Sequence, residues 1–200
     1  MRNMPDVQTG TPFSQALFQW LMKLAGWRIA GELPTLRRYV LIGAPHTSNW
    51  DFIIGMLLKY SLGMRFNFVG KDSLFRGPMG ILMRRLGGIP VNRRSRNNFV
   101  EQIVAAFKER EDLVIVITPE GTRSKSSYWR TGFYYIALGA GVPIVMGYLD
   151  YKHKVVGFGP TFTPSGDINA DFAFLRDFYQ GKTGKFPEKQ GAVELRPSSA

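Results

Sequence analysis

His46 and Asp51 are the two residues of this chain whose types and spacing point most directly to chemistry. A histidine is partly neutral near pH 7, so it can take a proton from an attacking hydroxyl. A carboxylate on its other ring nitrogen would fix the tautomer and stabilise the imidazolium that forms. Residues at this spacing do not share a helical face. The pair can meet only if His46 lies on a loop that folds back over the first turn of a helix containing Asp51.

The same stretch also has a purely structural interpretation. Ser48 and Asp51 have the spacing of a capping box in its Asp variant. Asp51 would then only cap a helix, and His46 would be a polar loop residue. Taken alone, this stretch does not decide between the two interpretations.

A second candidate segment follows the buried strand expected at residues 113–117. In it, Gly121 can adopt a positive φ and let backbone N–H groups approach a ligand. Glu120 would hold a substrate hydroxyl or brace an arginine, and Arg123 would bind phosphate. The alternative is a plain turn with a surface ion pair. A strand that ends in Pro-Glu-Gly-Thr-Arg-Ser, with Thr122 beside Arg123, favours a binding loop.

An arginine-rich segment lies between these two motifs. Residues 73–100 contain six arginines and no acidic residue. Arginine forks match phosphate oxygens in a bidentate manner. Most of these side chains are expected to form a solvated basic surface. Arg93, just beyond a short expected strand, is the preferred phosphate ligand.

Composition limits the classes of function. The chain has 26 basic and 15 acidic residues, and this balance favours an anionic partner such as nucleic acid, an acidic membrane surface or a phosphorylated metabolite. No nucleic-acid-binding module is recognisable, so a nucleic-acid partner is not expected. The absence of cysteine excludes disulfides, thiolate metal sites and a cysteine nucleophile. With two histidines, no metal site is expected, and His153 is predicted to be exposed in a charged turn.

The hydrophobic pattern predicts an α/β fold with a mixed, mostly parallel sheet flanked by helices. In such sheets, ligands bind at the carboxyl ends of the strands, which is where both candidate loops fall. The expected strands span residues 39–42, 65–69, 89–91, 113–117, 143–149 and 155–158, with an extension at 161–162, and the expected helices span residues 50–62, 78–86, 99–110, 131–140 and 171–179.

The N-terminal segment has the pattern of an amphipathic helix that begins at Thr11 and Pro12. Two interpretations remain open: the helix packs on the domain, or it lies in a membrane interface. Residues 132–149 carry no charge, but their glycines and Pro143 fit a helix end and a buried strand better than a membrane span. We expect an N-terminal helix and candidate anchor in residues 1–34, one domain in residues 35–180 and a loose tail in residues 181–200.

Four segments resemble, in order, the sequence blocks of the lysophosphatidic acid acyltransferase family, which are glycerolipid acyltransferases (1-acyl-glycerol-3-phosphate acyltransferases, PlsC-like) with a His-x4-Asp motif. They lie between residues 38 and 150, and the ordered set is more specific than any one block. The segments are residues 46–51, residues 70–80 with 88–93, residues 119–124 and residues 142–145. The fourth block departs from the family pattern, because Met146 and Gly147 stand where a second proline is usual.

The resemblance implies transfer of a fatty acyl group from a thioester of coenzyme A or acyl carrier protein to a hydroxyl of a lysophospholipid or glycerol-phosphate-like acceptor. His46 would be the general base, oriented by Asp51. Arg93 and Arg123 would hold phosphate, and Glu120, Gly121 and Thr122 would shape the acceptor site. It implies no bound cofactor beyond the thioester co-substrate, and peripheral attachment to anionic lipid on the cytoplasmic side of a membrane. The alternative is a non-catalytic anionic-lipid-binding protein on the same fold.

Overall fold

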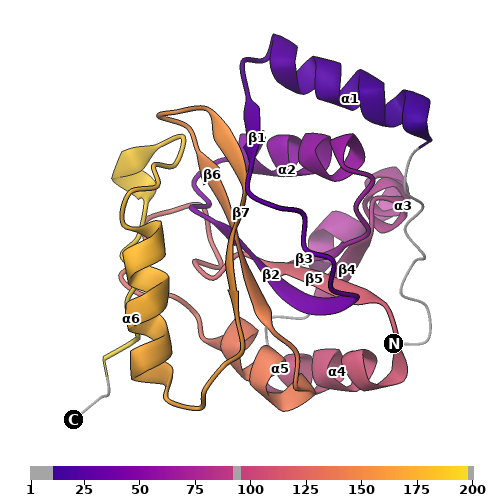
Figure 1. Ribbon diagram of the computed structural model, residues 1–200. Coiled ribbons are helices and arrows are strands. Elements are labelled where there is room, and N and C mark those ends of the chain that lie inside the picture. Colours follow the sequence, from indigo (N-terminus) through magenta and orange to yellow (C-terminus); the bar gives the residue numbers. More distant parts are fainter. Residues whose placement is uncertain (1–10, 92–95, 198–200) are drawn as a thin grey trace.

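The computed structural model describes residues 11–91 and 96–197, and within them seven strands form one sheet (Figure 1). The strands lie side by side in the order β1-β7-β6-β2-β5-β3-β4. Their bounds are β1 (Arg28–Ala30), β2 (Arg38–Ala44), β3 (Asn67–Lys71), β4 (Gly88–Val91), β5 (Leu113–Ile117), β6 (Ile144–Asp150) and β7 (Val155–Phe162). The helices are α1 (Pro12–Leu24), α2 (Trp50–Ser61), α3 (Gly77–Arg85), α4 (Arg96–Glu109), α5 (Gly132–Ala140) and α6 (Ile168–Tyr179), with short 3-10 helices η1 (Asp72–Phe75) and η2 (Pro187–Lys189).

The sheet is mixed and mostly parallel, which confirms the expected fold class. β2 pairs in parallel with both β5 and β6, and β3 pairs in parallel with β4 and β5. Only the β6–β7 pair is antiparallel among the described strands. The carboxyl ends of β2, β5 and β6 therefore meet at one edge of the sheet, where the loops after Ala44, Ile117 and Asp150 begin.

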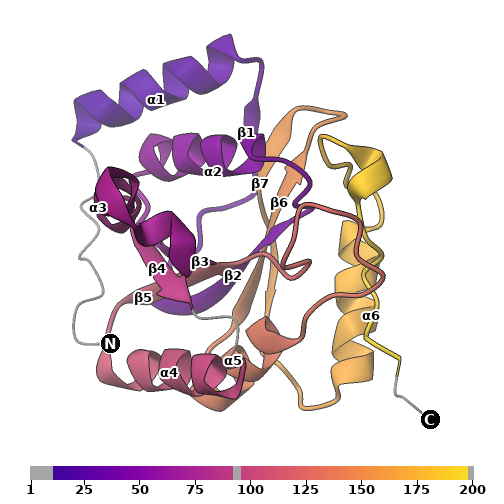
Figure 2. The ribbon, with the colours of Figure 1, turned by 180° about the vertical axis from the view of Figure 1, so that it is seen from behind.

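Helices cover both faces of the sheet (Figures 1 and 2). Strand side chains alternate between the faces, since successive residues of a strand point in opposite directions. Val40 and Ile42 of β2 pack in one core with α4, α5 and α6. Tyr39 and Leu41 pack in a second core with α1 and α2. The sheet is buried on both sides, which explains the continuous apolar runs of its central strands.

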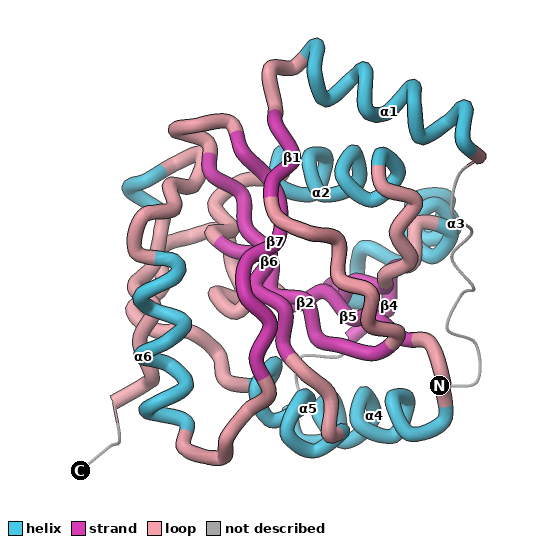
Figure 3. Tube along the Cα trace, in the orientation of Figure 1, coloured by secondary structure: helices cyan, strands magenta, loops and turns pink. Residues whose placement is uncertain are grey.

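Helix α1 lies against α2 (Figure 3). It has two apolar faces. Its N-cap Thr11 accepts a hydrogen bond from the Ser14 N–H, as the sequence predicted. On the inner face Met22 is buried and Phe18 stacks on Tyr60 of α2, with ring centroids 5.0 Å apart. On the outer face four apolar side chains remain exposed. These are Phe13 (81% exposed), Leu17 (45%), Trp20 (57%) and Leu24 (70%), which we call the α1 stripe.

The two interpretations of the N-terminal helix thus apply to different faces of it. The inner face packs on the domain, and the outer face is free to contact something else. Within the part of the chain that is described, no helix is long and apolar enough to cross a bilayer.

Two features of the ends differ from the expectation. β1, which the sequence did not predict, pairs with β7 and joins the N-terminal segment to the sheet. The expectation of a loose tail is wrong for residues 181–197. Trp129 N–H donates to the Glu194 carbonyl at 2.8 Å, and Phe186 N–H donates to the Thr47 hydroxyl at 3.1 Å. Val193 and Leu195 pack against the larger core. Isolated contacts hold this segment on the domain, and it has no periodic apolar face. Its attachment could therefore not be predicted from a sequence pattern.

Candidate active site

His46 and Asp51 meet where β2 gives way to α2. His46 lies on the loop, Asp51 lies in the first turn of α2, and His46 Nδ1 is 3.0 Å from Asp51 Oδ2. The side chain of His46 is 21% exposed and that of Asp51 only 3%. A carboxylate on Nδ1 places the proton of a neutral imidazole on that nitrogen, so Nε2 is left as the proton acceptor. The geometry is therefore that of an oriented general base.

Asp51 also accepts the Ser48 hydrogen bond that a capping box predicts, although the N-cap residue of α2 is Asn49, so part of the structural interpretation holds beside the chemical one. Its Oδ2 accepts hydrogen bonds from the backbone N–H groups of Thr47 and Ser48, each at 2.8 Å. Its other oxygen, Oδ1, accepts from the Tyr151 hydroxyl at 2.7 Å. Burial alone would raise the pKa of Asp51, but the hydrogen bonds from His46, Tyr151 and Ser48 together outweigh it and hold this pKa below its ordinary value. Asp51 is thus kept ionised beside His46.

Glu120 braces the His46 loop rather than facing open solvent. Its side chain is buried, and its Oε1 accepts a hydrogen bond of 2.9 Å from the His46 backbone N–H. Oε2 is buried and has no hydrogen-bond partner within the described residues. Burial raises the pKa of Glu120, while the backbone N–H groups oppose that shift. Glu120 therefore fixes the backbone from which the imidazole projects.

The loop after β5 has the conformation that its glycine suggested. Gly121 adopts a φ of +64°, and a Cβ there would lie 2.5 Å from Nε of Arg130. Its N–H donates to the Thr118 carbonyl at 3.0 Å, which closes the turn. Thr122 and Arg123 are exposed, and Arg123 forms no ion pair with another described residue. Arg93, the other predicted phosphate ligand, lies outside the described residues.

A pocket of about 890 Å³ opens beside these loops. His46, Asp51 and the turn from Gly121 to Ser124 line one part of it. The rest of the wall is largely apolar and comes from the sheet and α2, including Leu41, Phe52, Ile53, Met56, Phe68 and Val116. Its volume is in the range of pockets that hold small-molecule ligands. The arrangement places a base and a free arginine at one end of an apolar cavity.

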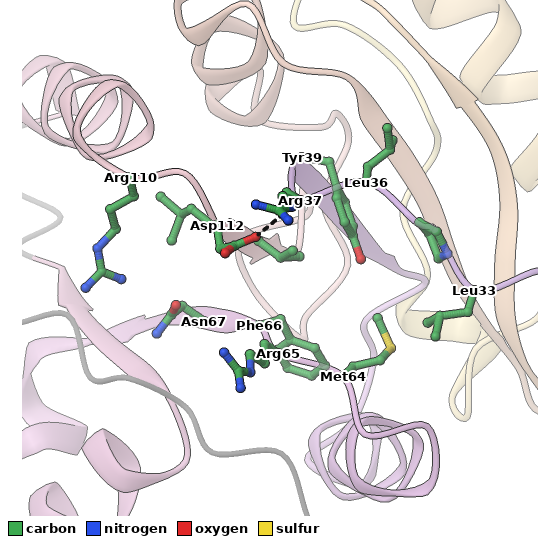
Figure 4. A pocket seen from close by; sticks show the side chains of 13 residues that line it. Leu33, Leu36, Arg37, Tyr39, Met64, Arg65, Phe66, Asn67, Arg110 and Asp112 are labelled. Atoms are coloured by element: carbon green, nitrogen blue, oxygen red, sulfur yellow. Dashed lines mark ion pairs between the residues drawn. The ribbon is translucent and has the colours of Figure 1, made fainter.

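A smaller pocket, of about 260 Å³, lies at the opposite ends of β2 and β5 (Figure 4). Arg37 and Asp112 form an ion pair across it, with Nε and Oδ1 3.8 Å apart. It contains none of the predicted site residues and offers no histidine or buried carboxylate. Among the residues that the structure describes, no group of three or more histidine or acidic side chains is arranged to hold a metal ion. His46, Asp51 and the turn from Gly121 to Arg123 instead share the larger pocket.

Tyr151 is the site residue that sequence reasoning missed. It directly follows β6, whose carboxyl end lies beside that of β2. The rule that placed the other two loops at this edge could have drawn attention to it. It was obscured by the charged turn around it, in which His153 is 56% exposed and its Nδ1 is 2.7 Å from Asp150 Oδ2.

Comparison with known proteins agrees with this fold and identifies the family of the chain. The model of the family described as Acyltransferase matches residues 27–147, so the chain belongs to the acyltransferase family. The curated 1-acyl-sn-glycerol-3-phosphate acyltransferase of Haemophilus influenzae (strain Rd) is 32% identical over an alignment of 139 residues that covers 64% of this chain and 56% of that protein. The chain thus spans little more than half the length of this relative.

A solved structure shows the same fold. The 1-acyl-sn-glycerophosphate (LPA) acyltransferase, PlsC, from Thermotoga maritima superposes with a TM-score of 0.56 at 17% sequence identity, covering 84% of this chain and 74% of that one. The likeness supports the mixed sheet with flanking helices described above.

Proposed function

We propose that this protein transfers a fatty acyl group from a thioester of coenzyme A or acyl carrier protein to a hydroxyl of a lysophospholipid or glycerol-phosphate-like acceptor. The observation that carries the proposal is the His46–Asp51 pair, 3.0 Å apart, in the wall of an apolar pocket. A binding protein has no need of an oriented base. Membership of the acyltransferase family supports the reaction class.

The proposed reaction is a direct transfer. Nε2 of His46 removes the proton of the acceptor hydroxyl, and the resulting oxygen nucleophile attacks the thioester carbonyl. The new carbon–oxygen bond forms, the carbon–sulfur bond breaks, and the thiolate leaves with the proton from the imidazolium. Asp51 stabilises the imidazolium while it exists. No bond to the protein forms at any step, and the thioester is the co-substrate.

The pocket suits substrates with a long apolar part and an anionic part. Its apolar wall would hold acyl chains, and Arg123 at its edge would pair with a phosphate. Arg93 remains a proposed second phosphate ligand. Gly121 and Thr122 form the turn that precedes Arg123, and Glu120 holds the backbone of His46 by a hydrogen bond.

The exposed apolar residues support peripheral attachment to an anionic membrane surface as part of the proposal. The α1 stripe projects away from α2, so it would enter the interface between headgroups and acyl chains. Apolar side chains that line the pocket are also partly exposed, among them Trp50, Ile53 and Met79. A lipid acceptor could then pass from the bilayer into the pocket without crossing water. The net charge of +11 favours anionic lipid.

The test is product formation by the purified protein with a panel of acyl-coenzyme A and acyl-carrier-protein donors and lysolipid acceptors, followed by mass. A product that requires the protein and disappears in His46→Ala supports the proposal and identifies donor and acceptor together. No product from any pair, with anionic liposomes still bound, favours the non-catalytic lipid-binding alternative.

A further inference from the structure

We propose that Tyr151 is a positioning residue for the His46–Asp51 pair, and that it does this by occupying the one carboxylate oxygen of Asp51 that His46 and the helix cap leave open. The inference rests on the proposed function of His46 as a base. It adds a residue outside the recognised sequence motifs.

The hydrogen bonds of Asp51 divide between its two oxygens. Oδ2 faces His46 Nδ1 and the N–H groups of Thr47 and Ser48. Oδ1 faces the Tyr151 hydroxyl at 2.7 Å. The side chain of Asp51 is 3% exposed, so bulk water cannot replace a missing donor freely. Tyr151 therefore determines how the carboxylate plane is turned, and that plane determines where His46 points.

The hydroxyl of Tyr151 is suited to this task because it keeps its proton. Burial and the adjacent Asp51 carboxylate both raise the pKa of Tyr151 above its ordinary value. The group therefore stays protonated near neutral pH and acts there as a donor to Asp51. A charged hydrogen bond of this kind is short and directional.

The ring of Tyr151 is itself fixed from the N-terminal side of the chain. Trp27 lies edge-on to it, with ring centroids 4.9 Å apart and an interplanar angle of 88°. Trp27 is buried, and its backbone N–H donates to the Met22 carbonyl in the last turn of α1. The Tyr151 N–H donates to the Thr183 carbonyl at 2.8 Å. A continuous series of contacts thus runs from α1 through Trp27 and Tyr151 to Asp51.

Tyr151→Phe removes only the hydroxyl and keeps the ring against Trp27. Without its donor, Oδ1 becomes a buried acceptor without a partner, the pKa of Asp51 rises and the carboxylate is free to turn. We expect kcat for acyl transfer to fall roughly 10- to 100-fold, the cost typical of losing a partner behind a reacting group, with KM changed less than about twofold. The acid limb of the pH profile of kcat should move to higher pH, because a carboxylate that has lost this donor makes the His46–Asp51 pair hold its proton more strongly.

Tyr134→Phe is the matched control. The Tyr134 hydroxyl also donates to a carboxylate, Asp171 Oδ2, at 2.8 Å, but it joins α5 to α6 on the other face of the sheet. Its kcat and pH profile should equal those of the wild type. A role of Tyr151 in folding alone would lower the thermal stability of Tyr151→Phe without moving its pH profile, and that result would also overturn the proposal. An unchanged kcat and an unchanged profile in Tyr151→Phe would overturn the proposal.

A measurement on the free protein separates this proposal from the proposed function. The Nδ1 and Nε2 resonances of His46 report the tautomer by NMR without any substrate. In the wild type we expect one tautomer, protonated on Nδ1. In Tyr151→Phe we expect a mixture of tautomers, and the change that accompanies proton uptake by the His46–Asp51 pair should occur at higher pH than in the wild type. Identical spectra in the two proteins would refute the role of Tyr151, whether or not acyl transfer is found. Trp27→Leu should shift the His46 resonances in the same direction.

Discussion

The backbone N–H of His46 donates a hydrogen bond to Oε1 of Glu120 at 2.9 Å, although the two residues are 74 positions apart in the chain. The contact is possible because β2 and β5 are parallel neighbours with Ile42 opposite Ile117, so the loops that follow begin side by side. The hydrogen bond joins the segment of residues 46–51 to the segment of residues 119–124. The loop after β5 therefore supports the loop after β2.

Glu120→Ala should therefore lower the rate of acyl transfer, although Glu120 contacts the backbone of His46 and not its imidazole ring. Loss of the acceptor leaves the His46 N–H unpaired and lets the loop shift, and a small misplacement of a reacting group is costly. We expect acyl transfer to fall by about 10-fold or more in Glu120→Ala. Glu120→Gln, which keeps an oxygen acceptor, should retain most of the activity. Equal activity in Glu120→Ala and in the surface control Glu101→Ala would contradict the bracing role.

The same residue makes a prediction about stability. Burial raises the pKa of Glu120. The folded protein therefore holds this proton more tightly than the unfolded chain, and stability from this group is lost as the pH rises above the unfolded pKa. As the pH rises from 4 to 7, the free energy of unfolding of Glu120→Gln should therefore increase relative to that of the wild type. Urea unfolding of both proteins at pH 4 and at pH 7 measures this difference.

The α1 stripe predicts where the protein meets a bilayer. Replacing Leu17 and Trp20 by glutamate puts two charges on a surface that would otherwise enter the interface. We expect binding to anionic vesicles to fall at least about 10-fold, with the far-UV spectrum and Tm nearly unchanged because both side chains are exposed. The control is Phe174→Glu, a comparable exposed aromatic on α6 on the other side of the sheet. Similar vesicle binding by both variants would remove the stripe as the anchor.

Arg123 offers a test of the acceptor class. It is exposed at the pocket edge and forms no ion pair with another described residue, so its guanidinium is free for a ligand. Arg123→Ala should raise KM for a phosphorylated acceptor by about 10-fold or more, the cost of a charge-assisted hydrogen bond. The neighbouring Lys125→Ala should leave KM unaltered. If Arg123→Ala affects acceptors with and without phosphate equally, the residue does not recognise phosphate.

Lys59 predicts an unusual pH dependence of stability. It is fully buried in α2, and its Nζ donates to the carbonyls of Phe66 at 3.0 Å and Leu86 at 2.8 Å. Burial lowers the pKa of Lys59 from 10.5 to about 8. The unfolded chain holds this proton more tightly than the folded one, so the penalty for burying the charge disappears as the pH rises from 8 to 10.5.

Measured against Lys59→Met, the free energy of unfolding of the wild type should therefore rise by about 2 kcal/mol between pH 7 and pH 9.5. Comparing the two proteins cancels the contribution of the tyrosines, which titrate in both. The exposed Lys108→Met is the matched control and should follow the wild type. A constant difference between wild type and Lys59→Met would show that Lys59 titrates normally.

Much of this arrangement could be predicted from the sequence because it depends on local patterns. Residues 113–117 read as a strand from their continuous apolar run, and the structure places β5 there. Ser48 and Asp51 predicted the start of a helix, and Gly121 predicted a tight turn. Both predictions depend only on residues that are close in the sequence. The expected mostly parallel sheet followed from the alternation of strands and helices.

The contacts that sequence reasoning missed are those between distant segments. The sequence gives no sign of the burial of Lys59, because nothing in α2 indicates that two carbonyls from other segments surround its ammonium group. Tyr151 meets Asp51 across 100 positions of the chain. Glu120 was expected to contact substrate or arginine, whereas it contacts the His46 backbone. Each of these contacts depends on the order of the strands in the sheet, and no local sequence pattern indicates that order.

The most direct test of the account is a double-mutant comparison of acyl transfer in His46→Ala, Asp51→Asn and the variant with both changes. If His46 is the base and Asp51 acts only through it, His46→Ala should lose about 10²–10⁴-fold in kcat, Asp51→Asn should lose less, and the double variant should be no slower than His46→Ala. Near-wild-type turnover in His46→Ala, or losses that multiply in the double variant, would contradict it.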